Sequence, residues 1–274
     1  MNIAIAIPVY KPVLSTDEVM SLQQCLAILH QYDIFLVCPK NLNIKAYQKV
    51  ASNRLKIMCF PDFFFRGIEG YNKLMMSRAF YKRFVAYDYL LIYQLDAWVF
   101  SNQLKEWCAK GYDYIGAPWF ELHKTHEEGY NLWCAGNGGL SLRRIEKFIQ
   151  VTNPYALVKL PRQIFQEDYH SLKDLVPCLL RSVGLKGNNL RHFRRKVKKD
   201  LWEDTFFSYG LTETRFKLNI PPAQEAALFS FECSPGYLYE HITKGALPFG
   251  CHAWRKYQYN EFWEQFIHRT PSMV

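Results

Sequence analysis

The chain has 274 residues, 49% of them apolar and 16% aromatic, which is ample for a sizeable core and excludes a disordered chain. Its net charge is +9, but eight Lys or Arg and no acid lie between Arg181 and Lys199, and subtracting these leaves +1. Because the basic character is local, the composition excludes a general nucleic-acid coat, and we expect no nucleic-acid partner.

Apolar runs of strand length alternate with helical segments through the first hundred residues. The pattern predicts strands over 2–9, 33–38, 55–60 and 89–95, and helices over 15–30, 42–51 and 71–84. Ser15 with Glu18 three residues later predicts an N-cap with a capping box. This order is typical of a parallel sheet with right-handed crossovers, so the predicted fold class is α/β, with helices flanking a mostly parallel sheet.

The alternation is looser after residue 100. We expect helices over 104–109 and 144–150, strands over 112–115 and 140–142, and a helical insertion over about 155–200 that ends in the basic segment. Residues 237–242 are predicted to return to the sheet, and 261–268 to form a terminal helix. Since neither a repeat nor a linker interrupts the chain, residues 1–274 are predicted to form one domain, with halves 1–100 and 101–274.

Eight cysteines occur without a CxxC pair, and several lie in apolar runs. They indicate buried free thiols in a reducing compartment. The first residues lead directly into a strand without a basic leader, so we expect a cytoplasmic location.

Asp96 ends the apolar run YDYLLIYQLDAWVF. A carboxylate is costly to bury unless a cation, a hydroxyl or water meets it, and ligands of open α/β sheets bind outside the carboxyl ends of the strands. One interpretation is a metal or nucleotide ligand, and the alternative is a cap of the following helix.

Three further motifs contain candidate functional residues. CAGNGGLSLR, with Asn137, Gly138 and Gly139, is either a tight turn or a loop that presents backbone amides to a sugar. WEDTFFS, with Glu203 and Asp204, is either an acidic helix start or a base in an apolar surround that raises its pKa. LPFGCHAW contains His252, which is either structural or the completing ligand of a Mn²⁺ site.

These motifs, together with AIPVYKP and YDYIGAPW and in this order from Ile3 to Trp254, resemble GT-A-fold glycosyltransferases, and more closely a bacterial branch of such domains. The resemblance implies a GT-A-like, Rossmann-type fold with a nucleotide-binding half (1–100) and an acceptor or catalytic half (101–274). It also implies roles for individual residues. Nucleotide contacts are implied for Pro8, Val9, Tyr10, Asn72 and Lys73, and contacts near the donor sugar for Asn137, Gly138 and Gly139.

The resemblance further implies that Asp96 is the first acid of a DxD motif that holds Mn²⁺ or Mg²⁺ with His252. Asp204 matches the base of inverting members, with Glu203 beside it. The motif departs from the family as Asp96-Ala97-Trp98, which lacks the second acid and puts metal dependence in doubt. If Asp204 is not a base, a retaining reaction remains open.

The expected function is the transfer of a sugar from a nucleotide sugar, with UDP favoured, to a glycan or lipid-linked glycan during surface polysaccharide assembly. The basic segment 181–199 is either a solvated surface or a patch, centred on Arg194, Arg195, Lys198 and Lys199, that contacts a phosphate-bearing acceptor or the anionic inner face of a membrane. The alternatives are a non-catalytic glycan- or nucleic-acid-binding module, and a sugar nucleotidyltransferase, which the lack of glycine in IPVYKPVLS disfavours.

Overall fold

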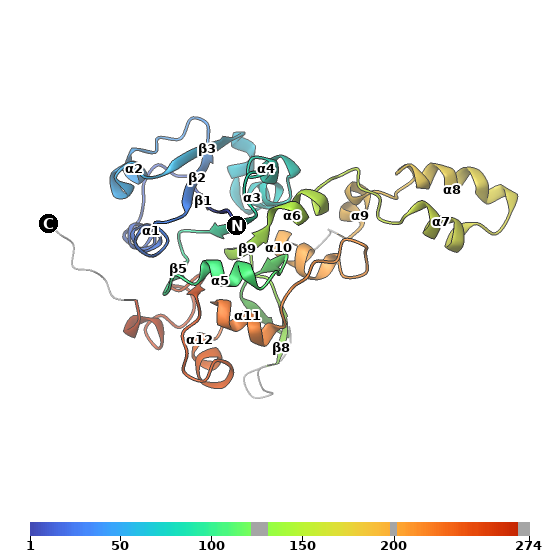
Figure 1. Cartoon of the computed structure of the whole chain (residues 1–274). Coiled ribbons are helices and arrows are strands. Elements are labelled where there is room, and N and C mark those ends of the chain that lie inside the picture. The colour runs from blue at the N-terminus through green and yellow to red at the C-terminus, as the bar shows by residue number, and fades with distance from the viewer. Residues whose placement is uncertain (122–130, 198–201, 268–274) are drawn as a thin grey trace.

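A six-stranded sheet forms the centre of the computed structural model, which describes residues 1–121, 131–197 and 202–267 (Figure 1). The strands stand in the order β3-β2-β1-β4-β9-β6. Their bounds are β1 Ile3–Pro8, β2 Asp33–Pro39, β3 Lys56–Phe60, β4 Tyr89–Tyr93, β6 Tyr114–Ile115 and β9 Leu140–Arg144. Only β9 runs against its two neighbours, so the sheet is mostly parallel, as predicted.

Helices cover both faces of this sheet. The first face packs against α1 (Thr16–Ile28), α2 (Lys45–Ala51) and α5 (Leu104–Ala109), and the second against α3 (Gly67–Met75), α4 (Arg78–Lys82) and α6 (Ile145–Val151). Along β1 the side chains alternate: Ile5 lies in the first core and Ala6 in the second. This is the period of two expected of a strand buried on both faces. The predicted α/β class is therefore confirmed.

The helix predicted over 71–84 is wrong in its bounds and continuity. It is divided into α3 and α4, because Ser77 has an extended backbone with φ −88° and ψ 123°. The hydroxyl of Tyr81 donates to the carbonyl oxygen of Met75 over 2.7 Å and so satisfies one of the acceptors at the end of α3. The capping box at Ser15 and Glu18 is confirmed.

A second, three-stranded sheet joins distant parts of the chain. It consists of β10 (Ser230–Phe231), β11 (Gly250–Cys251) and β5 (Trp98–Val99), in that order. β10 and β11 are parallel, and β5 is antiparallel to β11. This small sheet fixes the segments after residues 231 and 251 beside the end of β4.

Two predictions near the C-terminus are wrong. Residues 237–242 do not return to a sheet but form helical turns, α12 (Pro235–Tyr237) and η5 (Leu238–Ile242), which Pro235 favours as an early helical residue. Within the predicted helix over 261–268, the described residues contain only a short 3₁₀ turn, η6 (Trp263–Gln265), and residue 268 lies outside the described residues.

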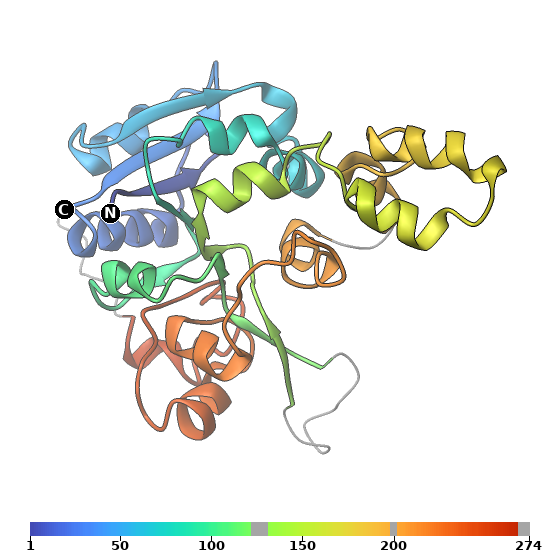
Figure 2. The same cartoon turned by 45° about the vertical axis from the view of Figure 1, so that its right-hand side comes forward.

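The remaining elements belong to the second half of the chain. The hairpin strands are β7 (Pro118–Phe120) and β8 (Leu132–Ala135), and η4 (Phe206–Gly210) and α11 (Ala223–Phe229) follow α10 (Glu203–Thr205). The insertion contains α7 (Pro161–Asp168), η3 (Leu172–Asp174), α8 (Leu175–Ser182) and α9 (Leu190–Val197). Figures 1 and 2 show α7 and α8 projecting from the body as an arm.

The eight cysteines are free in the structure, and five of them are buried. Within the described residues, no helix combines the length and the apolar character needed to cross a membrane.

Candidate functional site

A cavity of about 690 Å³ lies at the carboxyl ends of β1 and β4 and is lined by side chains from across the sequence. This volume is within the range usual for sites of small ligands. All the predicted site residues except Lys73 line it, namely Pro8, Val9, Tyr10, Asn72, Asp96, Asn137, Gly138, Gly139, Glu203, Asp204 and His252. The ammonium group of Lys73 pairs instead with Glu69 over 2.8 Å, and its side chain is half exposed.

The sheet topology explains why these segments meet. Pro8 ends β1, and β4 ends just before Gln94. Because the two strands are parallel neighbours, the segments that follow them leave the sheet side by side, at the side where the carboxyl ends of the parallel strands lie. Because β9 is antiparallel, its amino end lies at this side too, and the Gln94 amide donates to the carbonyl oxygen of Gly139 over 3.0 Å. The glycine loop is thereby placed beside the segment that carries Asp96.

Asp96 and His252 are neighbours across the small sheet. Cys251 on β11 faces Trp98 on β5, and the Oδ1 atom of Asp96 lies 3.2 Å from Nε2 of His252. Burial raises the pKa of Asp96, but its hydrogen bond with His252, the charges of His252 and Lys256 and a backbone hydrogen bond together outweigh burial and leave the pKa below its ordinary value. The Asp96 side chain is 54% exposed, so its carboxylate remains available to a ligand in the cavity.

Glu232 is a functional candidate that the sequence analysis missed. Its Oε1 atom lies 2.9 Å from Nδ1 of His252, and its Oε2 atom accepts a hydrogen bond from Nδ2 of Asn137 over 2.8 Å. Burial lowers the pKa of His252, and the bonds with Asp96 and Glu232 more than compensate, raising it to about 10. A carboxylate on Nδ1 fixes the ring so that Nε2 faces the cavity, as in many metal-binding histidines.

Gln94 is a further polar neighbour of His252 that the sequence did not reveal. Its Oε1 atom lies 3.2 Å from Nε2 of His252. Trp98, in contrast, is buried in β5 and packs edge-on against Trp254. The residue that accompanies Asp96 is therefore two positions before it, where the chain offers a neutral amide oxygen.

The donor atoms of Gln94, Asp96 and His252 fit a divalent cation. Two oxygens and an imidazole nitrogen suit Mn²⁺, and the 3.2 Å separations from Nε2 show that the three atoms converge. Among the residues that the structure describes, no three His, Cys, Asp or Glu side chains gather as a ready-made cation site. A cation at this point would therefore need oxygens from a bound ligand or from water.

The glycine loop is tightly packed and internally bonded. The amide of Gly138 donates to Oδ2 of Asp204 over 3.3 Å, and the amide of Gly139 donates to Oδ1 of Asn137 over 3.0 Å. The backbone amides expected to meet a sugar are thus engaged within the protein. A Cβ atom on Gly139 would lie 2.0 Å from Nε2 of His252, so glycine is required for the close approach of the imidazole.

Glu203 forms a buried ion pair with Arg143, which the sequence analysis also missed. Nη2 of Arg143 lies 2.9 Å from Oε1 of Glu203, and Nη1 lies 3.1 Å from Oε2. Burial raises the pKa of Glu203, and the guanidinium group opposes this rise. Both carboxylate oxygens of Glu203 are thus bonded to Arg143. Beside Asp204, Glu203 therefore serves to position this segment.

Asp204, next in the chain, keeps its carboxylate toward the cavity. Oδ1 accepts from the amide of Thr205 over 2.7 Å, and Oδ2 has the longer bond from Gly138. Burial raises the pKa of Asp204, and these backbone bonds oppose the rise. A partly desolvated carboxylate with a raised pKa is a suitable proton acceptor.

Asn72 connects α3 to this acidic segment. Its Oδ1 accepts from the amide of Glu203 over 2.6 Å, and its Nδ2 donates to the carbonyl oxygen of Ile68 over 2.8 Å. Both polar atoms of the Asn72 side chain are thus bonded within the protein, and they fix α3 to the segment of Glu203. The cavity is also lined by aromatic and apolar side chains, including Tyr10, Phe64, Phe65, Ile68 and Trp202. These side chains are suited to a flat ring, whereas the acidic ones are suited to polar groups.

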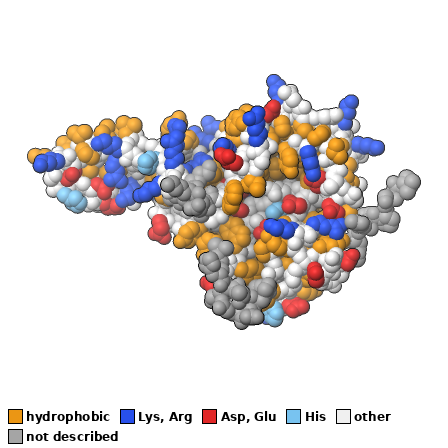
Figure 3. All heavy atoms as spheres, turned by 180° about the vertical axis from the view of Figure 1, so that it is seen from behind, with side chains coloured by type: hydrophobic (Ala, Val, Ile, Leu, Met, Phe, Trp, Pro, Cys, Tyr) orange, Lys and Arg blue, Asp and Glu red, His pale blue; other side chains and the backbone are white. Residues whose placement is uncertain are grey.

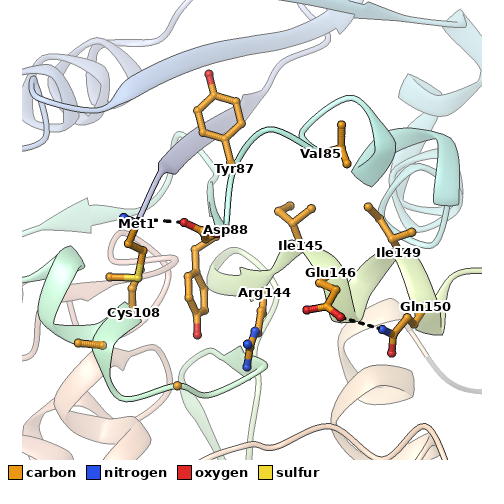
Figure 4. A pocket seen from close by; sticks show the side chains of 13 residues that line it. Met1, Val85, Tyr87, Asp88, Cys108, Arg144, Ile145, Glu146, Ile149 and Gln150 are labelled. Carbon is orange, nitrogen blue, oxygen red and sulfur yellow. Dashed lines mark hydrogen bonds and ion pairs between the residues drawn. The ribbon is translucent and has the colours of Figure 1, made fainter.

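A second cavity of about 690 Å³ lies at the opposite edge, by the amino ends of β1 and β4 (Figure 4). Its polar side chains are largely paired with one another: Gln150 donates to Glu146 over 3.3 Å, and the terminal amine lies 4.0 Å from Asp88. It contains no counterpart of the His252 cluster among its lining residues.

The chain is similar to three solved glycosyltransferase structures, each at low identity. Mouse xyloside xylosyltransferase 1 has a TM-score of 0.48 at 10% identity over 92% of this chain and 97% of that one. Galactosyltransferase LgtC, in complex with donor and acceptor sugar analogs, has a TM-score of 0.45 at 12% identity over 91% of this chain and 86% of that one. The glycosyltransferase GlyE of Streptococcus pneumoniae has a TM-score of 0.47 at 12% identity over 92% of this chain and 54% of that one.

No curated protein matches the sequence. A family model matches residues 54–252, which include Asp96, the glycine loop, Asp204 and His252. This match spans most of the chain, so the chain belongs to the family described as "Protein of unknown function (DUF5672)".

Proposed function

We propose that this protein is a GT-A-type glycosyltransferase that moves a sugar from a nucleotide sugar, with a UDP-sugar as the favoured donor, to a glycan or lipid-linked glycan. The observation that carries the proposal is that three kinds of group line one cavity: the cluster of Gln94, Asp96 and His252, the carboxylate of Asp204, and several aromatic side chains. A nucleotide sugar needs groups of these kinds, for its base, its diphosphate and its sugar.

The charge of the cavity supports a divalent cation, Mn²⁺ or Mg²⁺, between the protein and the diphosphate. Asp96 and Asp204 line the cavity, while Lys11 and Arg143 are each already paired with a glutamate. Asp96 alone would repel a diphosphate. The cation would be held by Asp96, His252 and the oxygen of Gln94, and it would neutralise charge developing on the leaving diphosphate.

In the proposed reaction, Asp204 removes the proton from the acceptor hydroxyl while that oxygen attacks C1 of the sugar. The bond from C1 to the diphosphate breaks, and the anomeric centre is inverted. Arg143 and Glu203 fix the backbone that presents Asp204, and Gly138 orients its Oδ2 atom. Glu232 holds the imidazole of His252 in place.

The acceptor is proposed to be presented at the cytoplasmic face of a membrane, during surface polysaccharide assembly. Part of the basic segment 181–199 supports this, because Lys186, Arg191 and Arg195 are exposed. Arg194 does not belong to the exposed patch: its Nη1 donates to the carbonyl oxygen of Met76, and its guanidinium group packs 5.9 Å from the ring centre of Phe206. Lys198 and Lys199 lie outside the described residues.

The first test is the thermal stability of the purified protein with UDP, GDP, dTDP or CMP, each with and without Mn²⁺. We expect one nucleotide to raise the melting temperature, and only with Mn²⁺, because a bound ligand stabilises the folded state and the cation needs phosphate oxygens. Asp96→Ala should remove this effect. No response to any nucleotide would contradict the proposal and favour a non-catalytic glycan-binding module.

Gly139→Ala should weaken Mn²⁺-dependent nucleotide binding by about tenfold or more. The added methyl group would occupy the position of the His252 imidazole, and the backbone of Gly139 needs no left-handed conformation, so the fold should persist. Gly236→Ala is the matched control, because its Cβ atom would meet nothing closer than 3.6 Å. Equal nucleotide affinity in both variants, measured by calorimetric titration, would show that His252 does not bind the cation.

A further inference from the structure

The arm carries a row of exposed apolar side chains. Leu172, Val176, Leu179 and Val183 are 81%, 61%, 51% and 71% exposed. They follow one another at spacings of four, three and four residues, which places them on one face of α8 and the turn before it. We call these four residues the arm stripe. The opposite face of α8 is occupied, since Cys178 is buried and α7 packs against it.

Basic side chains accompany the arm stripe. Lys173 and Lys186 are exposed at its two ends, next to Leu172 and to the exposed Leu185. Two acids of the arm are paired with a base, Glu167 with Lys159 and Asp168 with Arg181, whereas Asp174 keeps its charge and accepts a hydrogen bond from Ser171. The two lysines at the ends of the stripe therefore outnumber the one acid beside it that has no basic partner, and Figure 3 shows hydrophobic and basic side chains together along the arm.

The arm is braced internally and joined to the body at its base. The side-chain amide of the buried Asn188 donates to the carbonyl oxygens of Lys159 and Arg181 within the arm, over 2.8 and 2.9 Å. Nη1 of Arg194 donates to the carbonyl oxygen of Met76 in the body over 3.2 Å. Leu190 is buried in the core that contains Phe206, close in the chain to Asp204. The base of the arm and the segment that follows Asp204 thus share one hydrophobic core.

We infer that the arm stripe inserts into the interface of an anionic lipid bilayer, with Lys173 and Lys186 at the lipid headgroups. Apolar side chains with basic neighbours are the features of helices that lie in a membrane interface. This inference deepens the membrane contact proposed above and rests on that proposal. Its consequence is that the acceptor is lipid-borne and reaches Asp204 from the membrane side.

The net positive charge beside the arm stripe decides between a membrane and a second copy of the chain. In a two-fold dimer the same patch faces itself, so two surfaces of the same net positive charge would approach each other. An anionic surface instead attracts them, and it accepts the apolar stripe beneath the headgroups.

The test is sedimentation with vesicles of phosphatidylcholine and phosphatidylglycerol, or of phosphatidylcholine alone, without nucleotide or acceptor. The native chain should bind the anionic vesicles and not the neutral ones. Val176→Ser, Leu179→Ser and Val183→Ser, combined, should lower binding about tenfold or more. The matched control, Val13→Ser, Val85→Ser and Leu228→Ser, removes the same side-chain types from exposed positions outside the arm and should bind as the native chain does.

Equal binding of the two triple variants would overturn the inference. A native dimer that becomes monomeric in the arm-stripe variant, measured by light scattering, would assign the stripe to a second copy instead. The nucleotide response of the same preparations reports folding and the donor site, so a failed donor site and a failed membrane contact give different results.

Discussion

Asp204→Asn should lower sugar transfer by about 10²- to 10⁴-fold while donor binding stays nearly unchanged. The amide cannot accept the acceptor proton, but its oxygen can still accept the hydrogen bond from Thr205 that orients this side chain. The measurement is the rate of transfer, beside the Mn²⁺-dependent thermal shift with nucleotide. Glu213→Gln, at an exposed acid, is the control and should leave both quantities unchanged.

Two further measurements bear on the role of Asp204. Because burial raises its pKa, the rate should fall on the acid side at a pH above the ordinary aspartate value of about 4, since only the ionised form acts as a base. The product should have the inverted anomeric configuration by NMR. A retained configuration, or a variant with full activity, would exclude Asp204 as the base of an inverting reaction.

Arg143→Met should destabilise the protein by about 3–5 kcal/mol. The side chain of Arg143 is completely buried, and its removal would leave the Glu203 carboxylate buried without its cation. The free energy of unfolding in urea measures this effect. Arg144→Met is the control at the next residue, because that side chain is 41% exposed and lies 3.8 Å from Asp113, and it should cost less than about 1 kcal/mol.

The double variant Arg143→Met and Glu203→Met separates charge from packing. It removes both charges at similar volume, so it should recover at least about half of the lost stability. A double variant as unstable as Arg143→Met alone would mean that the loss comes from other contacts of Arg143, such as the 2.8 Å bond to the Tyr81 hydroxyl.

The sheet and the position of the cavity were predictable because they depend on local patterns. The segments 3–9 and 89–93 are continuous runs of apolar and aromatic residues, which is typical of strands buried on both faces. Once they are parallel, their ends meet at one edge, and so do the polar residues that follow them.

Gln94, Arg143 and Glu232 were missed because their roles depend on contacts between distant segments. The strands that bring Glu232 to His252 are two residues long, and such short runs have no periodicity to detect. Arg143 is completely buried in β9, where the buried Glu203, 60 residues later, accounts for its charge. Gln94 and Asp96 lie just after β4, where strand alternation no longer applies, so only the contact with the distant His252 reveals Gln94.

The small sheet that unites β5 with β11 also sets the time at which the candidate site can exist during synthesis. Gln94 and His252 are 158 residues apart, so the segment with the oxygen ligands leaves the ribosome well before its imidazole partner. At typical elongation rates this interval is roughly 8 to 30 s. During that interval Asp96 lacks its imidazole partner, and a nascent chain with a folded amino-terminal half would lack part of the cluster proposed to hold a cation.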